Sequence, residues 1–199
     1  MESTGFAYLG RYWYTKPLSA EATGIVSLPL TSYRDDPAVY VTPSIAVRHE
    51  RLERLVAELC GKPQDKFLPS SIGTSLVRLT NVKEHGLPSL HPAPDIQQQI
   101  AQLVSVIYNY GFSWMEENHT LNAILQGSLE FKYSSRPHAR FRIPTIYYLK
   151  GDPDSAHFWV ERGLAEIGPD QNIYADQYRR FATALVARLG APFSARREG

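Results

Sequence analysis

The sequence predicts an α+β fold: a three- to four-stranded antiparallel meander in the N-terminal part, packed with about five helices that lie mostly in the C-terminal half. Stretches rich in β-forming residues, joined by short polar connections, occupy the first 50 residues. The apolar period then changes from two residues to three and four, and helical stripes recur beyond residue 93. We expect a single domain over residues 1–199, with the sheet and first helix in residues 1–80 and the helical part in residues 93–190.

Three β-rich stretches make up the predicted meander. Residues 6–15 read FAYLGRYWYT, with Gly10 expected at a bulge or bend. Residues 24–33 read GIVSLPLTSY, in which Pro29 indicates an edge strand or a bulge. The third stretch, residues 38–47, is predicted as one strand because its apolar residues share one face at even spacing. These residues are Val39, Val41, Ile45 and Val47.

The first helix is predicted directly after residue 49. Its apolar stripe recurs at steps of three and four residues, as Leu52, Leu55, Val56 and Leu59. Gly61 is expected to end the helix in a left-handed conformation. We expect this helix to pack across the meander and to serve a structural role.

A loose connection follows over residues 62–94. Prolines and glycines interrupt it at Pro63, Pro69, Gly73, Gly86, Pro88 and Pro92. One more strand is predicted inside it, over residues 75–79. A connection of this length is uncommon in a compact domain and is often functional. The alternative, which we favour, is that it wraps the edge of the sheet.

Four helices are predicted in the second half of the chain. Their apolar stripes cover residues 96–107, 121–129, 156–167 and 174–189. Glycines are expected to end three of them, at Gly111, Gly168 and Gly190. Asp152 followed by a proline is typical of a helix N-cap.

The composition excludes several classes of protein. A net charge of +1 with 21% charged residues argues against disorder and against broad attraction to nucleic acid or to an anionic membrane. Cys60 is the single cysteine, so an internal disulfide is impossible and a cytoplasmic location is expected. The first ten residues lack the basic and apolar regions of a signal peptide, and no apolar run is long enough to span a membrane.

No catalytic residue, metal site or cofactor is predicted. His49 and Glu53 form an H-E-x-x-E pattern and would share a helix face, but the second histidine of the zinc-protease motif is missing. Cys60 lies at a helix C-terminus, where the helix dipole disfavours a thiolate, so we expect a small core residue there. The six histidines are scattered, and the common hydrolase and nucleotide-binding signatures are absent.

The basic segment, residues 132–150, is the strongest candidate for a functional surface. It contains five basic residues and no acidic one, and we expect it to be a strand or loop beside an acidic helical pair. Arginine and tyrosine are the residue types that dominate protein interfaces. The residues proposed to contact a partner are Tyr133, Arg136, Arg140, Arg142, Tyr147 and Tyr148. The alternative is internal pairing of these arginines with Asp152, Asp154, Glu161 and Glu166.

The pieces GF, GRYWY, GIVSLPLTSY and VYVTPSIAVRHERLERLVAEL resemble a family of uncharacterised bacterial α+β domains, over about the first 60 residues. The pieces YNYGFSWM and RIPTIYYLKGD look like the same type of protein. Some domains of this kind are encoded beside secreted bacterial toxins and look like their immunity proteins. The resemblance implies a small cytoplasmic protein, and it carries no catalytic residues to transfer.

The function that we predict is non-catalytic binding of a partner protein, such as a toxin or effector that the chain would neutralise by occlusion. Binding to nucleic acid or to a membrane is not expected. Two alternatives stay open. One is an enzyme whose site is assembled from dispersed residues. The other is a structural or homo-oligomeric protein that uses its aromatic sheet face.

Overall fold

The computed structural model describes residues 5–10, 12–62, 69–80, 89–90 and 95–190. The chain divides into two compact units, each built from two segments. Unit 1 consists of Met1–Arg48 and Ile72–Thr120, and unit 2 of His49–Ser71 and Leu121–Gly199. A single domain was expected, because the sequence contains no linker that clearly divides the chain in two. The first crossover between the units has no linker, because a strand that ends at His49 is followed at once by a helix that begins at Glu50.

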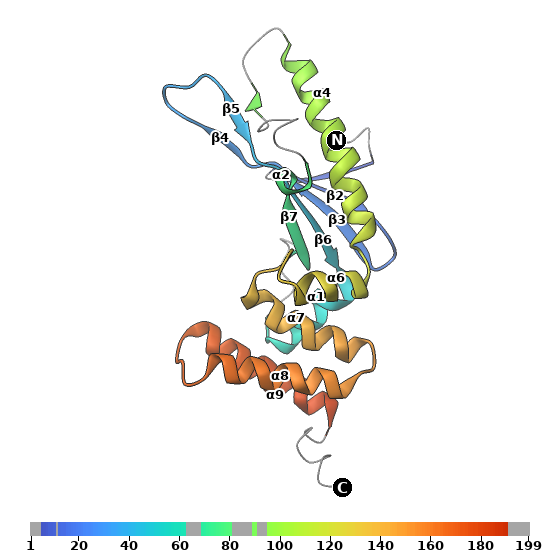
Figure 1. Cartoon of the computed structure of the whole chain (residues 1–199), viewed down its shortest axis with the longest axis vertical. Coiled ribbons are helices and arrows are strands. Elements are labelled where there is room, and N and C mark those ends of the chain that lie inside the picture. The colour runs from blue at the N-terminus through green and yellow to red at the C-terminus, as the bar shows by residue number, and fades with distance from the viewer. Residues whose placement is uncertain (1–4, 11, 63–68, 81–88, 91–94, 191–199) are drawn as a thin grey trace. The chain divides into compact units, whose positions relative to one another are not determined.

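A five-stranded sheet forms the centre of unit 1, so the α+β prediction is confirmed, while the number of strands exceeds the prediction (Figure 1). Its strand order is β1-β2-β3-β6-β7. The strands are β1 (Ala7–Gly10), β2 (Trp13–Pro17), β3 (Ala22–Ser27), β6 (Ser44–His49) and β7 (Ile72–Ser75). The pairs β1–β2, β2–β3 and β6–β7 are antiparallel. The register of β1 on β2 shifts between Tyr8 and Gly10, so the expected irregularity at Gly10 is confirmed.

A second, three-stranded sheet takes residues that were predicted to belong to the meander. It has the order β4-β5-β8, with β4 (Leu30–Ser32), β5 (Val39–Val41) and β8 (Ser89–Leu90). The predicted single strand over residues 38–47 was therefore wrong, because the chain leaves β5 and enters β6 of the other sheet across Pro43. Proline has no N–H to donate to a ladder. The Pro43 carbonyl instead accepts a hydrogen bond from Leu76 N at 2.9 Å.

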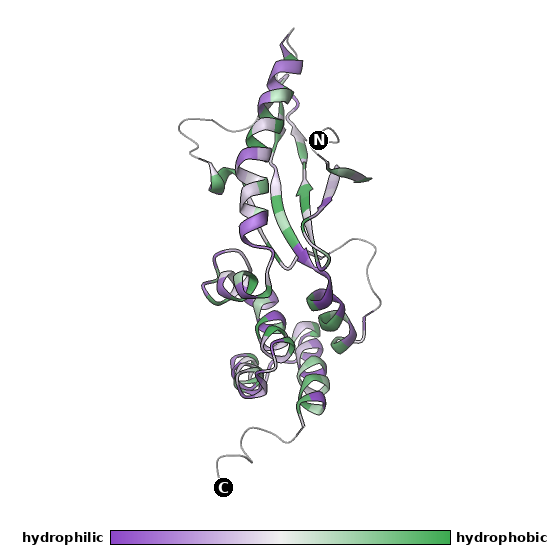
Figure 2. Cartoon of the chain, turned by 90° about the vertical axis from the view of Figure 1, so that its right-hand side faces the viewer, coloured by the Kyte–Doolittle hydropathy of each residue, from purple (hydrophilic) through white to green (hydrophobic). Residues whose placement is uncertain are grey.

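A long helical run lies along the five-stranded sheet (Figure 1). It comprises α4 (Ile96–Val106), the π-helix η2 (Ile107–Phe112) and α5 (Ser113–Glu117). The prediction that Gly111 ends this helix was wrong. A Cβ at Gly111 would lie 2.9 Å from Ile45 Cδ1, so the missing side chain lets the helix approach the sheet. Figure 2 shows polar and apolar residues interspersed along α4, and none of the residues of α4 is fully buried.

The loose connection is only partly described. The strand predicted over residues 75–79 was wrong, since residues 72–75 form β7 and the next four form the short helix α2 (Leu76–Leu79). Residues 63–68, 81–88 and 91–94 lie outside the described residues. The expectation that this connection wraps the sheet edge concerns mainly these residues, so it stays a prediction.

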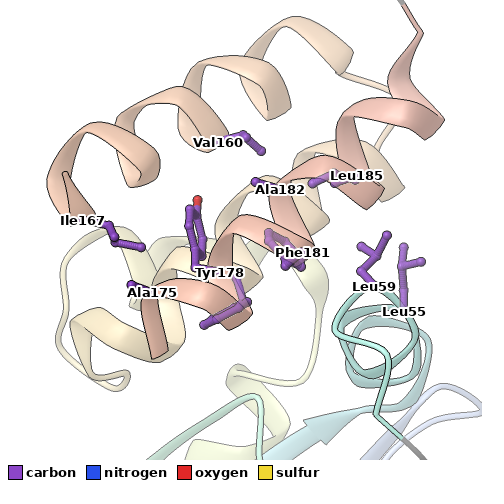
Figure 3. Packing of buried hydrophobic residues seen from close by; sticks show 10 residues of the cluster. Leu55, Leu59, Val160, Ile167, Ala175, Tyr178, Phe181, Ala182 and Leu185 are labelled. Carbon is purple, nitrogen blue, oxygen red and sulfur yellow. The ribbon is translucent and has the colours of Figure 1, made fainter. Parts of the chain in front are cut away.

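Unit 2 is a bundle of helices. One of them, α1, directly follows β6 in the sequence, and the others come from the C-terminal part of the chain. The helices are α1 (Glu50–Leu59), α6 (Leu121–Leu129), α7 (Arg136–Leu149), α8 (Pro153–Ile167) and α9 (Ile173–Leu189). The apolar stripe of α1 is confirmed. The expectation that α1 packs across the meander was not met, because α1 packs against α7 and α9. Figure 3 shows Leu55 and Leu59 facing Phe181 and Leu185 in the core of this unit.

Helix ends in unit 2 follow the sequence signals. Asp152 accepts a hydrogen bond from Ser155 N at 3.0 Å and thus caps α8, as predicted. Gly168 ends α8 at a φ of 56°. Within the described ranges, no helix is both long and apolar enough to cross a membrane.

The contact between α8 and α9 is especially close at one glycine. Tyr178 of α9 is fully buried, and Figure 3 shows its ring directed toward α8. A Cβ added at Gly163 would lie 2.1 Å from the Tyr178 hydroxyl oxygen. Only glycine allows the two helices this separation.

Candidate functional site

The basic segment is mainly helix. Residues 136–149 form α7, where a strand or loop was expected. Pro137 lies in the first turn, where a missing N–H costs nothing, and Pro144 is accommodated inside the helix. Helical geometry separates the arginines: Arg136 and Arg140 are four residues apart and share a side, while Arg142 points elsewhere.

Arg142 is engaged inside unit 2. Its side chain is 8% exposed and forms a two-pronged ion pair with Glu53 of α1, with Nε–Oε1 and Nη2–Oε2 distances of 2.7 and 3.2 Å. The Glu53 side chain is 3% exposed. Arg142 Nη2 also donates to the Ser70 carbonyl at 2.6 Å. Internal pairing therefore occurs at Arg142, but its partner is Glu53 and is none of the four acids that the alternative hypothesis named.

Arg140 pairs with one of the acids that the alternative hypothesis named. Its Nε and Nη2 donate to Glu166 Oε2 at 3.1 and 2.9 Å. Arg162, one turn before Glu166 on α8, donates to Oε1 of the same carboxylate at 3.2 Å. Burial favours the neutral carboxyl, but the bonds from both arginines outweigh it and hold the pKa of Glu166 below its usual value.

Aromatic rings support the arginines of this surface. The Arg136 guanidinium lies 5.1 Å from the ring centre of Phe131, and that of Arg162 lies 4.9 Å from the ring centre of Trp159. Such contacts stabilise a cation over a ring face and restrict its orientation. We name the set the arginine–aromatic surface: Phe131, Arg136, Arg140, Trp159, Arg162 and Glu166.

The hollow among these side chains is small. Its volume of about 20 Å³ is enough for about one water molecule. Ligand pockets usually enclose about 300–1,000 Å³. The arginine–aromatic surface therefore suits contact with a macromolecule better than enclosure of a small substrate.

The predicted tyrosines are half-buried and serve mainly in packing. The Tyr133 ring lies against Gly127, where an added Cβ would be 3.1 Å from Cδ2. Tyr148 packs against the hydrophobic core of unit 2. Tyr147 is half-buried as well. The structure thus brings together Arg136 and Arg140 among the six predicted residues.

Sequence reasoning missed Phe131, Trp159 and Arg162. A signal for two of them was present, because Trp159 and Arg162 are three residues apart, and Arg162 and Glu166 four apart, on one helix. These spacings place all three side chains on one face. Phe131 lies one residue outside the basic segment.

No metal site is found in the part of the chain that the structure describes, where no three His, Cys, Asp or Glu residues gather to hold an ion. Glu53 is occupied by Arg142. Cys60 packs partly buried against the core of unit 2, as predicted, and burial raises the pKa of its thiol. A thiol with a raised pKa is a poor nucleophile at neutral pH.

The arrangement presents planar hydrogen-bond donors on α7 and α8, two helices that contact each other, beside the rings of Phe131 and Trp159. Arginine donors of this kind recognise carboxylates, and aromatic rings supply rigid apolar area. In comparisons with known proteins, no family model, no curated protein and no solved structure matches the chain.

Proposed function

We propose that the chain is a non-catalytic cytoplasmic binding protein that occludes an acidic partner protein with its arginine–aromatic surface, in the manner of an immunity protein that neutralises a toxin. The observation that carries this proposal is that three arginines, Arg136, Arg140 and Arg162, line one small hollow together with a single carboxylate, that of Glu166, which accepts hydrogen bonds from Arg140 and Arg162. The positive charge in excess of that carboxylate favours an acidic partner.

The arginines are held in place before any partner binds. Arg140 and Arg162 are oriented by Glu166, while Arg136 and Arg162 rest on aromatic rings. Binding then requires less loss of side-chain entropy than it would with free arginines. Phe131 is 41% exposed and offers apolar contact area at the edge of the charged group.

The ion pairs within this surface are weak enough to be replaced by contacts to a partner's carboxylates. The Arg140–Glu166 pair has side-chain exposures of 23% and 39%. Ion pairs at the surface contribute about 0–1 kcal/mol to stability. The surface arginines are thus available for exchange with a partner's carboxylates, whereas Arg142 is committed to its buried pair.

The test uses the products of the genes adjacent to this one, co-expressed and purified with the wild-type chain. The double substitution Arg136→Glu/Arg140→Glu reverses charge on the proposed surface. The matched control, Arg51→Glu/Arg180→Glu, reverses two exposed arginines of α1 and α9 in the same unit. Circular dichroism establishes that both variants fold.

We expect the surface variant to fail to restore growth of cells that express the toxic product of the neighbouring gene. In calorimetry it should bind that product at least about tenfold more weakly than wild type, whereas the control variant should match wild type in both assays. Wild-type affinity should fall when salt is raised from about 50 to about 300 mM, because exposed charges are screened. A folded surface variant with full rescue and full affinity would refute the proposal. A set of metabolic genes around this one, with no binding neighbour, would favour the enzyme alternative.

A further inference from the structure

Unit 1 contains a cleft of about 690 Å³ that is unrelated to the arginine–aromatic surface. Its described lining residues come mainly from β1 and β2 of the five-stranded sheet, from the three-stranded sheet, and from α4 with the start of η2. Figure 1 shows where these elements lie in the fold. Representative lining residues are Tyr8, Tyr14, Leu30, Val41, Ile100 and Leu103. The volume lies in the range of about 300–1,000 Å³ that is typical of small-molecule sites.

The described residues of the lining carry no charge. Of the eleven wall residues within the described ranges, eight are aliphatic and three are tyrosines. Tyr8 and Tyr14 are partners across the β1–β2 ladder, and their ring centres are 5.3 Å apart. A charged ligand would lose hydration here without gaining a counter-ion from any of these eleven residues, which is costly. The lining therefore selects for a neutral ligand.

The third tyrosine, Tyr12, is held in an unusual backbone conformation. Its φ is 64°, in the left-handed region that a bulky residue seldom adopts. The Tyr12 carbonyl accepts a hydrogen bond from Leu28 N at 3.0 Å, so the conformation is tied to a second residue of the cleft. The Tyr12 side chain is 54% exposed, so its burial does not explain the strain. Strained residues gather at ligand sites, where the conformation is part of the function.

We propose that this cleft binds a neutral, predominantly apolar small molecule that carries a hydrogen-bonding group for the tyrosine hydroxyls. The aliphatic walls bury the apolar part of the ligand, and the tyrosines supply ring faces and polar ends. No described residue forms a hydrogen bond with the hydroxyl of Tyr8, Tyr12 or Tyr14. This inference is independent of the partner-binding function proposed for unit 2.

The test titrates the full-length chain with N-phenyl-1-naphthylamine, a neutral fluorophore, and with its sulfonated relative 8-anilinonaphthalene-1-sulfonate. Ile100→Glu places a charge in the cleft at a position that is 38% exposed, so folding should tolerate it. Ile173→Glu is the matched control, because Ile173 is 85% exposed and belongs to unit 2.

We expect saturable binding of one neutral probe per wild-type chain and weaker binding of the sulfonate. Ile100→Glu should weaken binding of the neutral probe by about tenfold or more, and Ile173→Glu should leave it unchanged. Tyr12→Gly should weaken probe binding while maintaining or raising the unfolding temperature, because glycine adopts a positive φ without strain. The proposal is overturned if the wild-type chain shows no saturable binding, if the sulfonate binds more tightly, or if both Ile→Glu variants behave alike.

Discussion

Replacing Arg142 by methionine should lower the free energy of unfolding by about 3–5 kcal/mol, which is the usual cost of removing one partner from a buried ion pair. The structure explains a cost of this size. Glu53, at 3% exposure, would lose both guanidinium hydrogen bonds, and the Ser70 carbonyl would lose its 2.6 Å donor. Each hydrogen bond to a charged group contributes about 1.5–3 kcal/mol. The uncompensated Glu53 carboxylate, which cannot reach water, dominates the loss.

The assay is urea unfolding followed by circular dichroism at the helical band, for Arg142→Met, for the double variant Glu53→Leu/Arg142→Met and for Arg180→Met. The double variant should recover much of the lost stability, because no charge is then left buried alone. The exposed Arg180 serves as a control and should stay within about 0.5 kcal/mol of wild type. An unchanged midpoint for Arg142→Met would refute the reasoning, as would a double variant less stable than the single one.

Two further predictions concern the helices of unit 2. Gly163→Ala should destabilise the chain by about 1–3 kcal/mol, since the new Cβ would lie 2.1 Å from the Tyr178 hydroxyl oxygen; thermal unfolding checks this, and an unchanged melting temperature would contradict it. The backbone hydrogen bond from Ser155 lowers the pKa of Asp152, so the stability due to its ionised form is present above the usual Asp pKa and is lost as the pH falls through the lowered one. The difference in free energy of unfolding between wild type and Asp152→Asn should therefore shrink in acid, as measured by urea unfolding at neutral and low pH. A difference that does not change with pH would contradict the prediction.

The predictions of helices held where a local signal was strong. The stripe of α1 is buried as expected, and the capping residue Asp152 begins α8. They failed where packing decides the outcome. Gly111 reads as a helix end, because glycine usually weakens a helix, yet here it allows contact with Ile45 inside a continuing helical run.

The candidate surface was predicted from composition. Of its six predicted residues, the structure brings together only Arg136 and Arg140. A run of arginines within residues 132–150 indicates positive charge, but it does not show which side chains turn inward. Arg140 and Arg142 are two residues apart, and the helix sends one to the surface pair with Glu166 and the other to the buried pair with Glu53. Arg162 and Trp159 join the surface from another helix.

The sequence alone determined the α+β class, most of the helices and the basic character of the segment that contains α7, because these depend on local periodicity and composition. The tertiary structure alone decided that Pro43 separates two sheets, that α1 belongs with α7 and α9, and that uncharged described residues from distant segments line the cleft of unit 1. The physical reason is the same in each case. These features depend on contacts between residues far apart in the chain, and the spacing of side chains along one segment does not specify which distant segment will cover them.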